Sequence, residues 1–235
     1  MAIEPTGDAP ISGISSIATQ HLLGELAGEY LRESGQRVAV ESVGGIDAAR
    51  RVQAGEAFDF VVLAAEAIEK LAGGGHVLGD SRVAIARSGV AVAVAASAPR
   101  PDVSDESRVR QAVLAARSVG YSTGPSGVYV ARLLERWGIA ATIAPRLVQA
   151  QPGVPVGTLI ARGEVELGFQ QLSELVHLPG IAVLGPLPPE IQLVTTFSAA
   201  VCSASRQQAA AGALLAFLAT PAGNAAKRRH GMEPA

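Results

Sequence analysis

Residues that could carry metal, redox or disulfide chemistry are scarce in this sequence. The single cysteine, Cys202, cannot form an internal disulfide, and its apolar neighbours indicate a buried small side chain. No Cys/His cluster has the spacing of metal ligands, because the four histidines are scattered at positions His21, His76, His177 and His230. We therefore expect no metal site and no cofactor.

Signals for a membrane or a nucleic acid are also missing. No apolar run reaches the roughly 18 residues that a membrane span needs. The start, Met1 to Pro5, has neither the basic nor the apolar region of a secretory signal. As written, the chain is expected in the cytoplasm, or in the periplasm if a signal peptide has been removed. The net charge is −2, and the one basic tract, residues 227–229, suits a helix end better than a nucleic-acid patch.

Three common catalytic loops are absent as well. There is no Gly-x-x-x-x-Gly-Lys-Ser/Thr phosphate loop and no strict Gly-x-Gly-x-x-Gly dinucleotide loop. There is also no Gly-x-Ser-x-Gly nucleophile elbow, since the segment 124–127 lacks that spacing. Nucleophilic hydrolysis is therefore disfavoured.

Small aliphatic residues are abundant. Hydrophobic residues make up 49% of the chain, whereas charged residues make up 17% and aromatic residues 4%. This balance is typical of α/β proteins, and apolar runs alternate with helical patterns as in βαβ units. We expect strands over 38–40, 58–64, 83–86, 90–95, 119–122, 167–170, 181–184 and 191–197. We expect helices over 19–33, 46–54, 65–72, from an N-cap at Ser104 to 115, and over 127–137, 158–162, 207–218 and after Pro221.

The chain length is comfortable for two small lobes. Two apolar segments, 83–95 and 191–202, sit where the chain would cross between lobes, with Arg87-Ser88-Gly89 interrupting the first. We predict a discontinuous lobe 1, residues 1–86 plus 196–235, and a lobe 2, residues 87–195. Each lobe is expected to hold a mixed, mostly parallel sheet flanked by helices, with the ligand cleft between the lobes.

Four loops share one design: each is rich in Gly with Ser, Thr or Pro, and is expected to follow a strand and open a helix. They are residues 12–16, 42–45, 122–127 and 152–157. Backbone N–H groups, hydroxyls and helix N-termini bind anions without needing lysine or arginine. Each loop alone is explained by ordinary capping and turn chemistry, but four of them in a chain this poor in charge favour an anion site.

We predict a small anionic ligand, contacted by residues of these loops, by an amide at a strand end, and by the arginine of the first crossing. The predicted residues are Ser15, Ser16, Gly44, Gly45, Arg87, Ser88, Ser122, Thr123, Ser126, Pro155, Val156 and Gln170. Gln170 and Gln171 could donate to an oxyanion, or simply mark an exposed strand end. Arg87 could pair with a carboxylate, or be an ordinary turn arginine. No catalytic residue is assigned; Asp47 and Glu174 are the nearest acids, and Asp47 suits a helix dipole better than a base.

At these loops the chain resembles the molybdate-binding-protein-like branch of the type II periplasmic-binding-protein fold. The resemblance extends over nearly the whole chain. The resemblance rests on segments 35–62, 124–139 and 156–169. Where relatives that bind molybdate have serines in the second loop, this chain has Gly44-Gly45, and where they often have a tyrosine it has Gln170-Gln171. Both departures suit a larger organic anion.

The pattern is similar to the subgroup of this branch that includes aconitate isomerase. That resemblance implies binding of a di- or tricarboxylate such as aconitate, and cis–trans isomerisation by allylic proton transfer. The alternative is a molybdate or other oxyanion-binding protein of an ABC transporter, with a transporter permease as partner if the chain is exported. A ligand-sensing domain of a regulator is a third reading.

Overall fold

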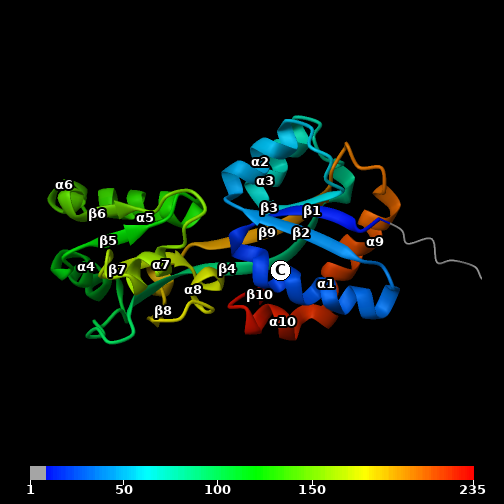
Figure 1. Cartoon of the computed structure of the whole chain (residues 1–235). Helices are drawn as coiled ribbons and strands as arrows, with labels where there is room; N and C mark the ends of the chain where they lie inside the picture. The colour runs from blue at the N-terminus through cyan, green and yellow to red at the C-terminus, as the bar shows by residue number, and fades with distance from the viewer. Residues whose placement is uncertain (1–8) are drawn as a thin grey trace, which may run out of the picture.

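The computed structural model describes residues 9–235 and shows two α/β lobes joined by long strands (Figure 1). One 10-stranded sheet runs through both lobes. Its main strand order is β2-β1-β3-β9-β4-β7-β5-β6, with β10 and β8 also paired to β4. The predicted two-lobed fold, with mixed sheets flanked by helices, is confirmed.

Lobe 1 is built around three parallel strands, β1 (Ile11–Ser16), β2 (Val38–Val43) and β3 (Phe60–Ala64). Helices α1 (Gln20–Ser34), α2 (Gly45–Gln53) and α3 (Ala65–Gly73) follow them in turn. The last part of the chain adds α9 (Gln208–Leu218), α10 (Asn224–Arg229) and the short strand β10 (Glu233–Pro234). Short 3-10 turns lie at η1 (Ile17–Thr19), η2 (Gly79–Ser81) and η5 (Pro221–Gly223).

Lobe 2 repeats this plan with shorter elements. The parallel strands are β5 (Val119–Tyr121), β6 (Leu147–Gln149) and β7 (Leu167–Gln171), and β8 (Ile181–Pro186) lies on the far side of β4. The helices are α4 (Glu106–Ala115), α5 (Pro125–Arg136), α6 (Ala140–Ile143), α7 (Val156–Ala161) and α8 (Leu172–Leu175). The 3-10 turns are η3 (Ala144–Arg146) and η4 (Pro189–Ile191).

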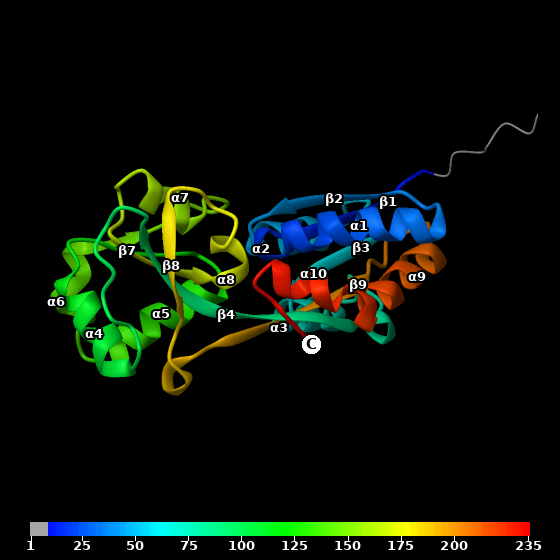
Figure 2. The same cartoon turned by 90° about the horizontal axis from the view of Figure 1, so that it is seen from below.

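Two antiparallel strands, β4 (Val83–Ala95) and β9 (Val194–Val201), connect the lobes (Figure 2). The expected interruption at Arg87-Ser88-Gly89 is wrong: β4 is one strand of 13 residues. These three residues stay extended because they pair with Thr196, Thr195 and Val194 of β9. The strand expected from residue 191 begins instead at Val194, after η4.

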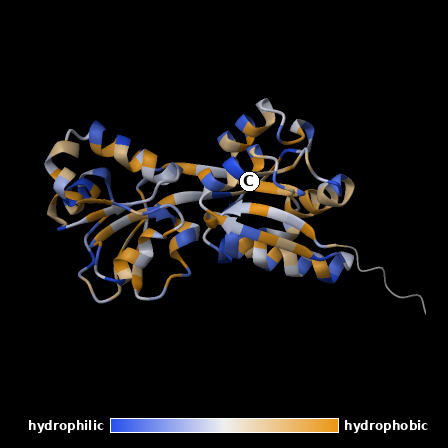
Figure 3. Cartoon of the chain, turned by 45° about the horizontal axis from the view of Figure 1, so that its top comes forward, coloured by the Kyte–Doolittle hydropathy of each residue, from blue (hydrophilic) through white to orange (hydrophobic). Residues whose placement is uncertain are grey.

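The buried cores divide between the lobes. Two clusters draw on residues 11–86 and 197–232, and two others draw on residues 90–191. In Figure 3 the strands carry the most hydrophobic stretches, while hydrophilic segments gather on the outer helices and loops. We propose the gaps between these sets, at 86/87 and 195/196, as the lobe boundaries.

Helix boundaries follow the sequence signals closely. In α1 the residues Leu22, Leu26 and Tyr30 are buried on one face, and Gly35 ends the helix with φ +73°. The left-handed conformation has a low energy only for glycine, so the sequence predicts this helix end.

Three further sequence-based expectations need correction. The first loop, residues 12–16, is itself strand β1, because its alternating small residues pack between β2 and β3. The N-cap of α4 is Asp105 and not Ser104: the Asp105 carboxylate accepts from the backbone N–H of Arg108 at 2.8 Å. The elements β6, α6, α8 and β10 were not expected, since each has six residues or fewer and no clear periodicity.

Among the described residues no single helix is long and apolar enough to cross a membrane. The segments Gln208–Leu218 and Pro221–Arg229 meet the length and composition requirement only as a pair bent by 54°. Half of this pair, α9, packs Leu214, Leu215 and Leu218 into the core of lobe 1.

The lobes contact each other through a cluster of three histidines. His21 lies on α1, His230 follows α10, and His177 belongs to lobe 2, just after α8. The His21 and His177 rings are 4.2 Å apart between centroids, and a ring nitrogen of His177 lies 2.8 Å from one of His230. Glu25 accepts from Arg229 and lies 2.7 Å from His230, and these contacts hold the pKa of Glu25 below its usual value.

This cluster should make stability depend on pH. Burial, and then repulsion from His21 and His230, hold the pKa of His177 below its ordinary value of 6.5. The unfolded chain therefore takes up a proton first as pH falls, so the free energy of unfolding should decrease below about pH 6.5. Urea unfolding at about pH 7.5 and 5.5 measures this.

His177→Gln should reduce that loss, whereas His76→Gln, a histidine outside the cluster, should retain it. An identical pH dependence in wild type and His177→Gln would contradict the assignment.

Candidate anion site between the lobes

Strand direction brings the loops of the two lobes face to face. β4 runs from lobe 1 into lobe 2, antiparallel to both β9 and β7. Because β9 is also antiparallel to β3, the parallel strands of lobe 1 run in the same direction as β4, towards lobe 2. The parallel strands of lobe 2 run with β7, towards lobe 1. The carboxyl ends of both sets therefore face each other, and ligands of α/β sheets bind at such ends.

Two contacts show that these edges meet. A Cβ added to Gly44, at the start of α2, would lie 3.6 Å from the backbone nitrogen of Gly153 in lobe 2. The short helix α8 of lobe 2 packs against η1, which directly follows β1 in lobe 1. The second and fourth predicted loops thus approach each other at the junction of the lobes, and the first lies opposite α8.

Two buried hydroxyls at this junction have no hydrogen-bond partner within residues 9–235. They are Ser16 Oγ, at the end of β1, and Ser173 Oγ, in the first turn of α8, whose residues are 8% and 3% exposed. By contrast, Ser15 Oγ lies 2.8 Å from Ser42 Oγ. A buried hydroxyl without a partner costs about 1–3 kcal/mol, so unsatisfied groups of this kind mark places where a ligand can bind.

The helices that begin at these edges leave their first N–H groups without side-chain caps. The N-cap residues of α2, α3 and α5 are Gly44, Ala64 and Gly124, and none of them makes a side-chain cap hydrogen bond. Helix N-termini carry partial positive charge and free N–H donors. Helix dipoles therefore give the candidate site a positive potential.

The third loop is shaped by one glycine. Ser122 Oγ lies 3.1 Å from Ser126 Oγ, and Thr123 is partly exposed beside them. A Cβ on Gly127 would lie 1.6 Å from the carbonyl oxygen of Ser122, so only glycine allows the first turn of α5 to rest on this backbone. The loop thereby holds Ser122, Thr123 and Ser126 together at the carboxyl end of β5.

Gln170 was predicted to contact the ligand, but in the structure its side chain is engaged by other protein groups. Its carbonyl accepts from the backbone N–H of Val156 at 2.7 Å, and its amide donates to Glu174 Oε2 at 2.6 Å. The N–H of Val156, at the start of α7 after Pro155, therefore already donates to a protein group. Gln171 is equally engaged: its amide contacts Thr195 Oγ1 at 2.7 Å and lies against the Ser88 carbonyl.

Glu174 is one of the two acids that lie nearest to the predicted loops in the sequence, and the sequence alone assigned it no role. It is partly accessible on α8, beside Ser173, at the junction with η1. Burial raises the pKa of the Glu174 carboxyl to about 7, although the hydrogen bond from Gln170 favours the charged form. The other acid, Asp47, is partly exposed and paired with Arg50 on α2.

The structure does not bring Arg87 and Ser88 to the facing loops as donors. Arg87 Nε donates to the carbonyl of Pro234 at 3.0 Å, because β10 pairs with this part of β4. Ser88 Oγ donates to the carbonyl of Gly231 and accepts from the backbone N–H of Ser173, both at 3.3 Å. Both side chains fasten the C-terminal segment to β4.

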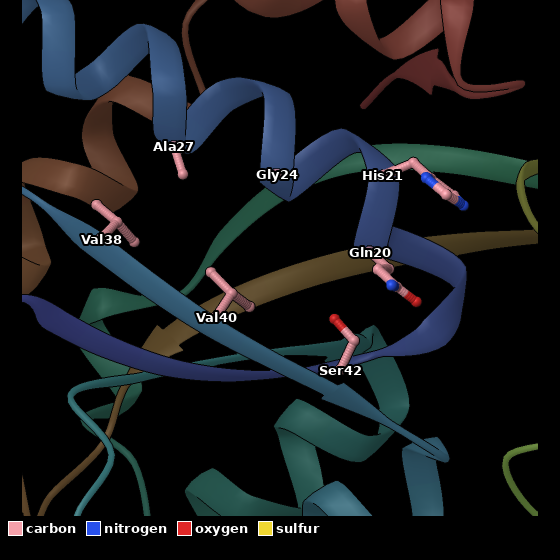
Figure 4. Close-up of a pocket in the computed structure, with 7 residues that line it drawn as sticks. All are labelled: Gln20, His21, Gly24, Ala27, Val38, Val40 and Ser42. Carbon is pink, nitrogen blue, oxygen red and sulfur yellow. The ribbon is translucent and has the colours of Figure 1, made fainter.

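A groove of about 470 Å³ runs between α1 and β2 (Figure 4). Ala27, Val38 and Val40 line its apolar end, and the polar ends of Gln20 and Ser42 lie together at the other. That polar end reaches the carboxyl edge of lobe 1, where Ser42 contacts Ser15. In the part of the chain that the structure describes, no three His, Cys, Asp or Glu side chains form a group that could hold a metal ion.

Comparison with known proteins matches this architecture to one family. The model of the bacterial extracellular solute-binding protein family matches residues 12–233. The chain belongs to this family. An aconitate isomerase from Pseudomonas sp. is 36% identical over 234 residues, which cover 96% of this chain and 89% of that protein.

Solved structures of solute-binding proteins share the fold. The periplasmic molybdate-binding protein of Azotobacter vinelandii superposes with a TM-score of 0.80 at 20% identity, covering 94% of this chain and 98% of that one. AgtB of A. tumefaciens R10, in complex with agropinic acid, superposes with a TM-score of 0.71 at 15% identity, covering 97% and 83%. The family predicted from the sequence is thus confirmed, and membership indicates a small solute as ligand.

Gly127→Ala tests the construction of the third loop. The added methyl group cannot coexist with the Ser122 carbonyl, so we expect the free energy of unfolding to fall by about 1–3 kcal/mol. Gly212→Ala, in the middle of α9 with no atom within 4 Å of the added Cβ, should instead gain about 0.5–1 kcal/mol. Urea denaturation of both variants measures the difference, and equal stabilities would contradict the close approach.

Proposed function

We propose that this solute-binding protein takes a small organic anion, a di- or tricarboxylate such as aconitate, between its lobes and interconverts the cis and trans isomers of aconitate. The observation that carries the anion site is the pair of unpartnered buried hydroxyls, one from each lobe, at a junction where uncapped helices begin. The relation to aconitate isomerase across nearly the whole chain supports the substrate.

The geometry suits a ligand with several carboxylates. Lobe 1 offers the ends of β1 and β2, with Ser15, Ser16, Gly44 and Gly45, and lobe 2 offers the third loop with Ser122, Thr123 and Ser126. Donors on two facing edges can hold carboxylates at opposite ends of one molecule. Gly44 and Gly45 add no side chain to this space, and both lie partly exposed at the start of α2.

The reaction requires only proton transfer. A proton leaves the methylene group of aconitate and another returns one allylic position away, so the double bond moves and its geometry can change. The intermediate carries enolate-like charge next to a carboxylate, and helix N-termini and hydroxyls stabilise such charge. Solute binding and isomerisation thus use the same anion site.

A thermal-shift screen tests the ligand class. We expect stabilisation by aconitate isomers, and about 2.7 kcal/mol at a ligand concentration one hundred times the dissociation constant. Citrate, tricarballylate, molybdate, tungstate and sulfate complete the panel. A shift with molybdate or tungstate alone would refute the carboxylate proposal and favour an oxyanion carrier working with a transporter permease.

Replacing the unpartnered hydroxyl of Ser16 gives a second test. Ser16→Ala should leave the ligand-free protein as stable as wild type or more stable, because no bond is lost, while aconitate binding weakens about tenfold, or ~1.4 kcal/mol. Calorimetric titration measures affinity, and urea unfolding measures stability.

Ser205→Ala is the matched control, a buried serine whose hydroxyl donates to Asp59 at 2.7 Å. It should lower stability by about 1–3 kcal/mol and leave affinity unchanged. An unchanged affinity in Ser16→Ala would place the site elsewhere.

A further inference from the structure

The proposed isomerisation needs a group that accepts a proton from carbon and returns it, and the anion donors cannot do this. Serine hydroxyls are weak bases without an activating partner. The acid–base group must also lie at the cleft, within hydrogen-bond reach of the substrate. Few side chains at the facing edges meet both conditions.

We propose that Glu174 is the acid–base group of this reaction and that Gln170 is its positioning residue. This inference rests on the proposed isomerase function. Glu174 stands on α8, the lobe 2 element that packs against η1 of lobe 1, next to the unpartnered hydroxyl of Ser173. A substrate held by the hydroxyls of Ser16 and Ser173 would therefore lie at α8, the helix that carries this carboxylate.

The carboxylate of Glu174 is oriented by a fixed amide. Gln170 is 2% exposed, and its carbonyl accepts from the Val156 N–H. That bond sets which end of the amide faces Glu174, so the nitrogen donates to Oε2. Oε1 makes no hydrogen bond among the described residues and is left to meet the substrate.

Glu174 also differs from the other acids in charge environment. Glu25, Glu41 and Glu166 each pair with an arginine, which holds their pKa below the usual range. Glu174 has no cationic partner within residues 9–235, and its pKa near neutrality populates both the base and its conjugate acid. A group in that range can take a proton and give it back at similar rates.

Other candidates lie in less suitable surroundings. Asp59 is buried at the amino end of β3, the opposite edge from the cleft, and accepts from Ser12, Ser205 and Gln207. His21 is exposed on α1, where its ring stacks with that of His230 and is tilted against that of His177. His21 is therefore the comparison that the experiment must include.

The step balances without any other reactant. The Glu174 carboxylate removes one proton from the methylene carbon, and the C–H electron pair delocalises over three carbons and the adjacent carboxylate. The resulting carboxylic acid, which is partly accessible and exchanges its proton with water, delivers a proton to the former vinylic carbon, and the double bond forms between the other two. Nothing is oxidised or reduced, and Glu174 returns to its carboxylate form.

The test compares wild type, Glu174→Gln, His21→Gln and the exposed control Glu190→Gln. Conversion of trans-aconitate is followed by chromatography, deuterium uptake from D₂O by mass spectrometry, and binding by calorimetry. We expect Glu174→Gln to lose about 100-fold or more in turnover and to lose deuterium uptake, while aconitate still binds within a few-fold. Glu190→Gln should match wild type.

Gln170→Ala tests positioning through the pH profile. Wild-type turnover should rise with pH through about 7, as Glu174 loses its proton. Without the Gln170 donor the charged form is less favoured, so this limb should move to higher pH. A purely structural role for Gln170 would lower the rate without moving the limb and would overturn that assignment.

The outcomes separate the two proposals. If wild type binds aconitate but converts none of it, the isomerase function fails and this inference fails with it. If wild type converts aconitate and Glu174→Gln does so equally well, or if only His21→Gln loses turnover and deuterium uptake, Glu174 alone is refuted and the isomerase function stands.

Discussion

The direction of one strand determines where this protein can bind a ligand. β4 belongs to both lobes and lies antiparallel to β9 on one side and to β7 on the other. The parallel strands of the two lobes must therefore point at each other. Every loop that follows such a strand is delivered to the same junction, although the loops come from segments more than a hundred residues apart. This meeting of the loops is a consequence of strand pairing before any side chain is considered.

Polar groups are satisfied very differently at the two edges of the lobe 1 sheet. At the amino edge, the buried Asp59 carboxylate accepts from Ser12 N–H, Ser12 Oγ, Ser205 Oγ and Gln207 Nε2 at 2.7–3.2 Å, which ties β1, β3 and the segment after β9 together. At the carboxyl edge, Ser16 keeps a buried hydroxyl that has no hydrogen-bond partner in residues 9–235. Since burying an unpaired hydroxyl costs free energy, the contrast separates a structural edge from the proposed binding edge.

The proposed site combines the positive ends of helix dipoles with the Glu174 carboxylate, whose pKa burial raises to about 7. Helix dipoles, hydroxyls and backbone N–H groups attract an anion but add no mobile cation that would pair with Glu174. An arginine or lysine there would lower the pKa of Glu174 and make it a poorer proton carrier at neutral pH. A chain with 17% charged residues can thus hold an anion and keep an acid–base group beside it.

The amino-acid sequence by itself determined the family, the alternation of helices and strands, and the glycine and serine loops, because these depend on local periodicity and turn chemistry. It could not show that residues 83–95 form one strand or that residues 12–16 are a strand and not a loop, because both depend on pairing with distant segments. Gln170 was visible as an unusual strand-end residue, but its bonds to Val156 and Glu174 come from three different elements. Only the tertiary structure decided that Arg87 serves the C-terminal strand and that Glu174 stands at the junction. The hydrogen-bond partners of a side chain and its burial depend on which distant segments surround it, and a single sequence does not show this.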